Sequence, residues 1–129
     1  TSFNELRREA LAVQRWNMLH PTDKPRISYV EACLDGTPGP VIAATDYMKA
    51  YAAQISDFVD GTFTALGTDG FGRSDTREKL RSFFEVDRHY IAVAALNSLV
   101  EDQVLESKVV AEAIETFGID PEKPDPATI

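Results

Sequence analysis

The sequence predicts an α/β fold, a partly parallel sheet with flanking helices, on three observations. Val41–Ala44 is a short apolar run without polar alternation, as in a buried parallel strand, and Phe63–Leu66 is a second β-prone run. A glycine-rich turn and a helix start follow the second run, which is the strand–turn–helix order of α/β proteins. Helical stripes of apolar residues with capping signals occupy most of the remaining chain.

Composition limits the function classes. The chain has 129 residues, enough for one domain with a core, and a formal net charge of −8. This charge argues against nucleic acid or an anionic membrane as partner, because both require a basic footprint. Cys33 is the only cysteine, so no internal disulfide exists and a cytoplasmic location is expected. No membrane span or signal peptide is visible. Because residue 1 is Thr rather than Met, we expect a fragment or a processed chain.

Three helices are predicted before the glycine-rich turn. The first covers about residues 4–19, and a short second helix covers about residues 28–34 and ends at Gly36. The third follows the first strand and is capped by Thr45 or Asp46. Its apolar face consists of Met48, Tyr51, Ala52, Ile55 and Val59.

Three further helices are predicted after the turn. They cover about residues 76–84, about residues 88–101, and the segment between Ser107 and Gly118. Asp87 and Ser107 are the expected N-caps of the last two. Tyr90–Leu96 is apolar almost all round, so we expect it to be buried centrally, with Ala94 and Ala95 against the sheet.

The chain is expected to divide into an α/β domain and a tail. The domain covers residues 1–120, and residues 121–129, which contain three prolines, form an irregular C-terminal tail. The acidic stretch 120–125 is most simply a solvated end.

The glycine-rich turn is the best candidate site. Its candidate residues are Gly67, Asp69, Gly70, Gly72, Arg73, Asp75 and Arg77. One interpretation is an anion site at a helix N-terminus. The favoured one is a structural turn in which local aspartates, with Asp75 as the cap, already satisfy the free N–H groups. In that case Gly70 and Gly72 adopt positive φ, and Arg73 and Arg77 bridge to carboxylates of this or a neighbouring domain. The glycine spacing is not a dinucleotide-binding fingerprint.

Outside this turn we expect no catalytic, cofactor-binding or metal-binding residue. His20 and His89 are far apart in sequence and lack ligand spacing. Trp16 and Met18 form either a docking patch or, as we favour, part of the core. Cys33 has no close cationic neighbour in sequence that would create a reactive thiolate.

Four stretches of the chain resemble one protein family. They are Gly67–Arg77 followed by Phe84–Asp87, Thr1–Phe3 with Glu5–Leu6, Arg15–Pro21, and Thr45–Lys49. Over nearly its whole length the chain is similar to the C-terminal domain of the large homodimeric bacterial pyruvate dehydrogenase decarboxylating (acetyl-transferring) component. That family uses thiamine diphosphate and belongs to the transketolase-like superfamily.

The resemblance implies a transketolase C-terminal-domain-like fold with a five-stranded, mostly parallel sheet, two of whose strands lie upstream of this chain. It implies a parent enzyme that decarboxylates pyruvate and reductively acetylates the lipoyl group of the partner dihydrolipoamide acyltransferase. Thiamine diphosphate and Mg²⁺ are then bound by domains absent from this chain, and none is expected on the fragment. The fragment itself is expected to be inactive and to serve homodimer assembly and packing against the middle domain.

The alternative to the enzyme-domain interpretation is a stand-alone small α/β binding or interaction module. It would use the Gly67–Arg77 turn for an anionic ligand, or a bare sheet edge for a protein partner.

Overall fold

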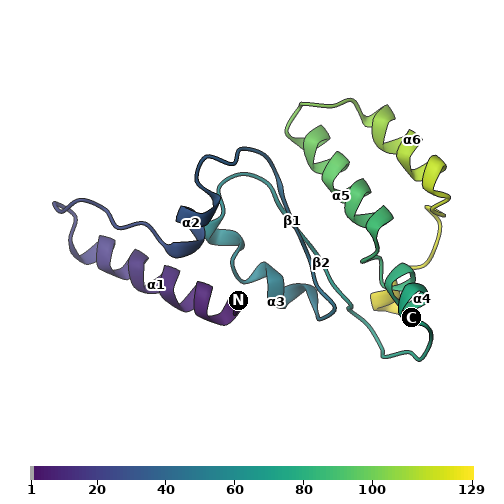
Figure 1. Cartoon of the computed structure of the whole chain (residues 1–129), viewed down its shortest axis with the longest axis horizontal. Coiled ribbons are helices and arrows are strands. Elements are labelled where there is room, and N and C mark those ends of the chain that lie inside the picture. The colour runs from purple at the N-terminus through teal and green to yellow at the C-terminus, as the bar shows by residue number, and fades with distance from the viewer. Residues whose placement is uncertain (1) are drawn as a thin grey trace.

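The computed structural model describes residues 2–129 and confirms the predicted α/β class (Figure 1). Thr1, part of the stretch Thr1–Phe3 that carries the family resemblance, lies outside the described residues. The elements are α1 (Phe3–Leu19), α2 (Tyr29–Leu34), β1 (Val41–Ala44), α3 (Lys49–Ala53), η1 (Ser56–Phe58, a 3-10 turn), β2 (Phe63–Leu66), α4 (Arg77–Phe83), α5 (Arg88–Glu101), α6 (Ser107–Phe117) and η2 (Pro126–Thr128, a 3-10 turn). None of the described helices is both long and apolar enough to cross a bilayer.

The two strands form a parallel pair, as the sequence predicts. Val41 is paired with Phe63 and Ala44 with Leu66. The chain crosses between the strands through α3 and η1. Helices α3 and α5 both contact the two strands, and Figure 1 shows them on opposite sides of the sheet, with α1 and α2 beside α3 and with α6 beside α5. Each face of the sheet is therefore covered by a helix, as a parallel sheet requires.

The main hydrophobic core lies on the α3 side of the sheet, where α1, α2 and η1 meet. Its buried members are Ala10, Val30, Ile55 and Phe58, with Phe3, Leu6, Leu34, Val59 and Phe63 packed around them. Ser28 and Glu31 form a capping box that starts α2: the Glu31 N–H donates to Ser28 Oγ at 3.4 Å, and the Ser28 N–H donates to Glu31 Oε2 at 3.0 Å. This cap fixes the start of α2, the helix whose residue Val30 lies in the core.

Helix α5 begins where the sequence predicts but is less buried than expected. Asp87 caps it and accepts hydrogen bonds from two backbone N–H groups of the first turn. The expected central burial of Tyr90–Leu96 is wrong, because this segment is only half-buried throughout, including Ala94 and Ala95. The fully buried residue of this helix is Ser98, whose hydroxyl donates to Ala94 O at 2.9 Å. The apolar character of a helix on all sides does not by itself supply neighbours on all sides, and here the sheet and α6 cover α5 only in part.

Two other helices differ from the prediction at their ends. Helix α3 stops at Ala53 and the chain continues as the 3-10 turn η1, so the single helix expected to extend to Val59 is two short pieces. Helix α6 contains Ser107 as its first residue, and Glu106, which makes no side-chain cap, stands at the N-cap position. Gly118 ends α6 in the left-handed region at φ +66°, as its predicted role requires.

The chain has a large surface for its mass. Its solvent-accessible area is 8989 Å² at 14.3 kDa, whereas a compact monomer of this mass exposes roughly 6,800 Å². The excess follows from the arrangement in Figure 1, in which helices lie side by side across a two-stranded sheet rather than around a thick core. A sheet of two strands is marginal alone. Much apolar helix and strand surface is therefore left uncovered by the described residues.

Candidate functional site

The candidate site is the segment Gly67–Arg77, here called the glycine turn, which follows the carboxyl end of β2. Gly67 is buried, and an added Cβ would lie 2.5 Å from Lys49 N and 2.6 Å from Tyr47 O. The next residue holds this contact, because the Thr68 N–H donates to Tyr47 O at 2.8 Å. Gly67 is therefore required by a close backbone approach and not by a positive φ.

Asp69 supplies the helix cap that the sequence assigned to Thr45 or Asp46. Its Oδ1 accepts a hydrogen bond at 3.0 Å from the N–H of Lys49, the first residue of α3. Met48, which stands at the N-cap position, makes no side-chain bond. A carboxylate from the glycine turn thus caps α3, the helix in the crossover between β1 and β2. This long-range cap explains why α3 begins later than predicted.

The two glycines predicted to have positive φ differ. Gly70 has φ +115°, as predicted, and a Cβ there would collide with the carbonyl oxygen of Pro126. The prediction for Gly72 is wrong: its φ is not positive, and a Cβ there would meet nothing within 4 Å. Phe71, between them, is 81% exposed. The described fold therefore explains Gly70 but neither Gly72 nor Phe71.

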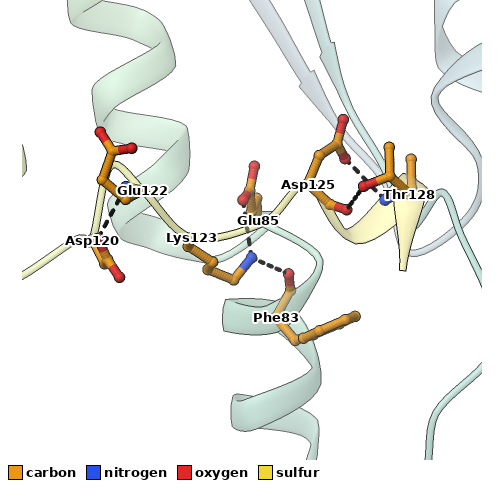
Figure 2. Close-up of polar contacts among 8 residues, drawn as sticks. Phe83, Glu85, Asp120, Glu122, Lys123, Asp125 and Thr128 are labelled. Carbon is orange, nitrogen blue, oxygen red and sulfur yellow. Dashed lines mark hydrogen bonds and ion pairs between the residues drawn. The ribbon is translucent and has the colours of Figure 1, made fainter.

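The C-terminal segment, residues 120–129, is hydrogen-bonded to the end of α4 (Figure 2), and its Pro126 lies against Gly70 of the glycine turn. Lys123 Nζ donates to Phe83 O at 2.8 Å and pairs with Glu85 Oε1 at 3.0 Å. Pro126 is buried and opens η2. The expectation of a solvated end at residues 120–125 is therefore wrong for Lys123, because long-range contacts that the local composition does not reveal hold its side chain in place.

The arginines of the glycine turn make no carboxylate bridge within residues 2–129. The guanidinium of Arg73 lies over the ring of Phe83, 4.1 Å from its centroid, in a cation–π contact. Arg77 takes part in none of the ion pairs among the described residues. The ion pair in this region comes from α4, where Arg81 Nη2 lies 3.3 Å from Asp46 Oδ2. A bridge from Arg73 or Arg77 to a neighbouring domain stays a prediction.

Helix α4 begins one residue later than the Asp75 cap predicts. Thr76 is the N-cap, and its Oγ1 accepts a hydrogen bond from the Lys79 N–H at 3.4 Å. Asp75 accepts instead from the Thr76 N–H, at 2.7 Å. Because side chains of the turn already engage N–H groups here and α4 has only seven residues, the geometry favours the structural interpretation over an anion site at this helix end.

An open cleft of about 480 Å³ runs along the glycine turn and α4. Its charged lining consists of Arg73, Arg77, Arg81, Asp46 and Asp75. Both aspartates are engaged, one by Arg81 and the other by the Thr76 N–H, whereas Arg77 pairs with no carboxylate among residues 2–129. With three arginines and two aspartates in its lining, the cleft carries net positive charge on a protein that is acidic overall.

The two histidines belong to separate aromatic stacks. His20 stacks on Trp16 with ring centroids 4.2 Å apart, and His89 stacks on Phe117 with centroids 4.8 Å apart. Among residues 2–129 no group of three or more His, Cys, Asp and Glu side chains is placed to hold a metal ion.

Trp16 lies in a polar stack rather than in the core. The guanidinium of Arg26 lies 3.8 Å from its ring centroid, and Asn17 holds the Arg26 backbone by two hydrogen bonds of 2.8 and 2.9 Å. Met18 is 71% exposed. The favoured prediction of core packing is therefore wrong for Met18, and sequence reasoning missed Arg26 because its partner lies across a turn.

Residues 1–87 match the family described as the transketolase-like TK C-terminal domain. The chain is also 64% identical over 126 residues to the pyruvate dehydrogenase E1 component of Pseudomonas aeruginosa, which covers 97% of this chain. It is 53% identical over 128 residues to the protein of the same name from Cupriavidus necator, covering 99% of the chain, and 48% identical over 127 residues to that of Escherichia coli K12, covering 98%.

The chain spans 14% of the length of each of these three relatives. The family match covers well over half of the chain, and it includes both strands and the whole glycine turn. The chain therefore belongs to the transketolase-like C-terminal domain family and is homologous to part of the bacterial pyruvate dehydrogenase E1 component.

Proposed function

We propose that this chain is the C-terminal α/β domain of a cytoplasmic pyruvate dehydrogenase of the acetyl-transferring type. The parent enzyme decarboxylates pyruvate with thiamine diphosphate and Mg²⁺, and it reductively acetylates the lipoyl group of a dihydrolipoamide acyltransferase. Residues 1–120 form the domain and residues 121–129 its C-terminal tail. The identity of 48% to 64% with proteins named pyruvate dehydrogenase E1 component, over nearly the whole chain, supports this assignment.

The role of this domain in the parent is assembly of the homodimer and packing against the other domains, not chemistry. One observation carries this proposal: the chain exposes 8989 Å², about 2,000 Å² more than a compact monomer of its mass. An excess of that size is more than twice the roughly 800 Å² that each partner contributes to a standard protein interface. The half-buried apolar face of α5 and the unpaired outer edges of the two strands are part of it.

The absence of a group of three or more His, Cys, Asp and Glu side chains placed to hold a metal ion among residues 2–129 supports placing the metal elsewhere in the parent. Mg²⁺ binds through carboxylate and carbonyl oxygens. The three aspartates near the carboxyl ends of the strands are already engaged, Asp46 by Arg81, Asp69 by the Lys49 N–H, and Asp75 by a backbone N–H. We therefore place the cofactor and the metal on other domains of the parent and assign this chain no catalytic residue.

The test compares the 129-residue chain with the full-length parent. With thiamine diphosphate and Mg²⁺ supplied, the parent is expected to release carbon dioxide from pyruvate, and the 129-residue chain is expected to release none above background. Release by the 129-residue chain would refute the assembly role. An inactive, correctly folded parent would refute the enzyme assignment.

The stand-alone module is tested by the size of the natural polypeptide. Intact-protein mass spectrometry or an immunoblot of the source cells is expected to show a polypeptide of the length of the relatives. A species of 14.3 kDa alone would support the module instead.

A further inference from the structure

Two adjacent residues of the glycine turn have no role in the described fold. Phe71 is 81% exposed at the tip, although burial of a Phe side chain is favourable. Gly72 follows it with ordinary φ and with open space where a Cβ would stand. By contrast, Gly67 and Gly70 are both explained by close contacts with Lys49 and Pro126. A glycine beside open space is what a close approach by another backbone requires.

Two arginines, Arg73 and Arg77, follow these residues in the chain, and their side chains have different surroundings. Arg73 is fixed in place by its stacking over Phe83, whose backbone oxygen is in turn bound by Lys123. Arg77 is the first residue of α4 and pairs with no carboxylate among residues 2–129. Both residues contribute to the lining of the cleft of about 480 Å³. The fixed position of Arg73 lowers the entropy that a partner must overcome to bind it.

The chemistry of this surface fits a protein segment better than a free anion. A single exposed aromatic side chain beside two arginines is the composition of an interface anchor. A polyanion would meet Asp46 and Asp75 in the same cleft and a chain of net charge −8 around it. A side-chain carboxylate, by contrast, accepts paired hydrogen bonds from one guanidinium without crowding the aspartates.

We propose that Phe71, Gly72, Arg73 and Arg77 form a docking surface for a carboxylate-bearing segment of the parent polypeptide outside residues 1–129. The segment places an Asp or Glu against Arg77, an apolar residue on Phe71 and its backbone over Gly72. This inference rests on the proposed function, because the occupant is a part of the same long enzyme. The relatives supply such a part, since the chain spans only 14% of their length.

Photo-crosslinking in the full-length parent identifies the segment that contacts the docking surface. A benzophenone amino acid replaces Phe71, and in a matched variant it replaces Val104, which is 66% exposed in the connection between α5 and α6. The expected product from position 71 is a link to an Asp- or Glu-containing peptide of the parent outside residues 1–129, well above the Val104 yield. A yield no higher than that of Val104, or links only to residues 1–129 or to another protein, would overturn the proposal.

Hydrogen exchange tests the role of Arg77 without a probe in the turn. In the full-length parent, Arg77→Ala is expected to speed exchange of the backbone amides of residues 70–73 about tenfold, the equivalent of one charge-assisted hydrogen bond. The control is Arg15→Ala, which removes an exposed arginine of α1 and is expected to leave these amides unchanged. Equal exchange in both variants would overturn the proposed contact.

Pyruvate decarboxylation by the unmodified parent separates the two hypotheses. An active parent in which Phe71 forms no specific crosslink refutes the docking surface alone. A parent without activity whose position 71 links to its own acidic segment refutes the enzyme assignment and supports the docking surface.

Discussion

Replacing Gly67 by alanine is expected to disrupt the junction between the glycine turn and the crossover. The new Cβ would lie 2.5 Å from Lys49 N and must move by about 0.9 Å to reach the 3.4 Å at which ordinary contacts begin. Backbone surrounds the site, so no flexible side chain can give way. A shift of that size lengthens the 2.8 Å bond from Thr68 N to Tyr47 O beyond hydrogen-bonding distance.

The expected cost follows from the bonds that the shift breaks. The Thr68–Tyr47 bond contributes about 1 kcal/mol, and the bond from the Lys49 N–H to the Asp69 carboxylate contributes about 1.5–3 kcal/mol. Alanine recovers about 0.4–1 kcal/mol by restricting the unfolded chain. The net loss is about 2.5 kcal/mol, which lowers the melting temperature of a domain of this size by roughly 10 °C.

The matched control is Gly72→Ala, in the same turn but beside open space. It is expected to leave the stability of the domain unchanged or to raise it by about 0.4–1 kcal/mol. Thermal unfolding of the 129-residue chain by circular dichroism measures both variants. In the full-length parent, where the proposed docking segment lies over Gly72, hydrogen exchange at the Thr68 and Lys49 amides compares Gly67→Ala with the unmodified protein. Equal melting temperatures for the two variants would refute the argument from close approach.

Two further predictions concern the C-terminal half of the chain. Lys123→Met is expected to lower the free energy of unfolding in urea by about 1–3 kcal/mol, because it leaves the Phe83 carbonyl and the Glu85 carboxylate without their partner. The control, Lys108→Met, breaks an exposed ion pair and is expected to cost well under about 1 kcal/mol. Similar urea midpoints for the two variants would show that the C-terminal segment is not anchored. Burial, and after it the charges of nearby carboxylates such as Glu85, raises the pKa of Tyr90 in the folded protein. The contribution of the neutral Tyr90 hydroxyl to the free energy of unfolding is therefore complete below the unfolded pKa of about 10, and it is lost as pH rises through the folded pKa. In melts between pH 8 and 11, Tyr90→Phe is expected to reduce the alkaline loss of stability, and an unchanged pH profile would contradict this assignment.

Elements with local signals could be predicted from the sequence. Both strands have the predicted limits, because each is a short β-prone or apolar run closed by turn residues. Helix α5 also begins and ends as predicted, because its cap, Asp87, is the residue directly before it. The pairing of the strands follows from the same run-and-crossover pattern.

Features that depend on distant residues could not be predicted. The start of α3 is set by Asp69, on the far side of β2, so the local candidates Thr45 and Asp46 were misleading. In the candidate site, positive φ at Gly70 was predictable from glycine in a turn, but the collision with Pro126 was not. Composition alone also cannot show which surface covers an apolar helix, which is why the burial of α5 was overestimated.

The contact between Gly70 and Pro126 also sets an order of events during synthesis. Residues 70 and 126 are separated by roughly 3–11 s of translation at 5–20 residues per second. The pairing of the strands and the capping of α3 involve no residue beyond Asp69, whereas α5, which covers the other face of the sheet, and the C-terminal segment are synthesised later. During this interval the glycine turn lacks its contacts with the C-terminal segment, which includes Lys123 and Pro126, so Phe71, Arg73 and Arg77 lie in a less restrained loop. A slow stretch of codons between α6 and Pro126 therefore prolongs the time in which the exposed Phe71 of this turn is available to chaperones and to misassembly.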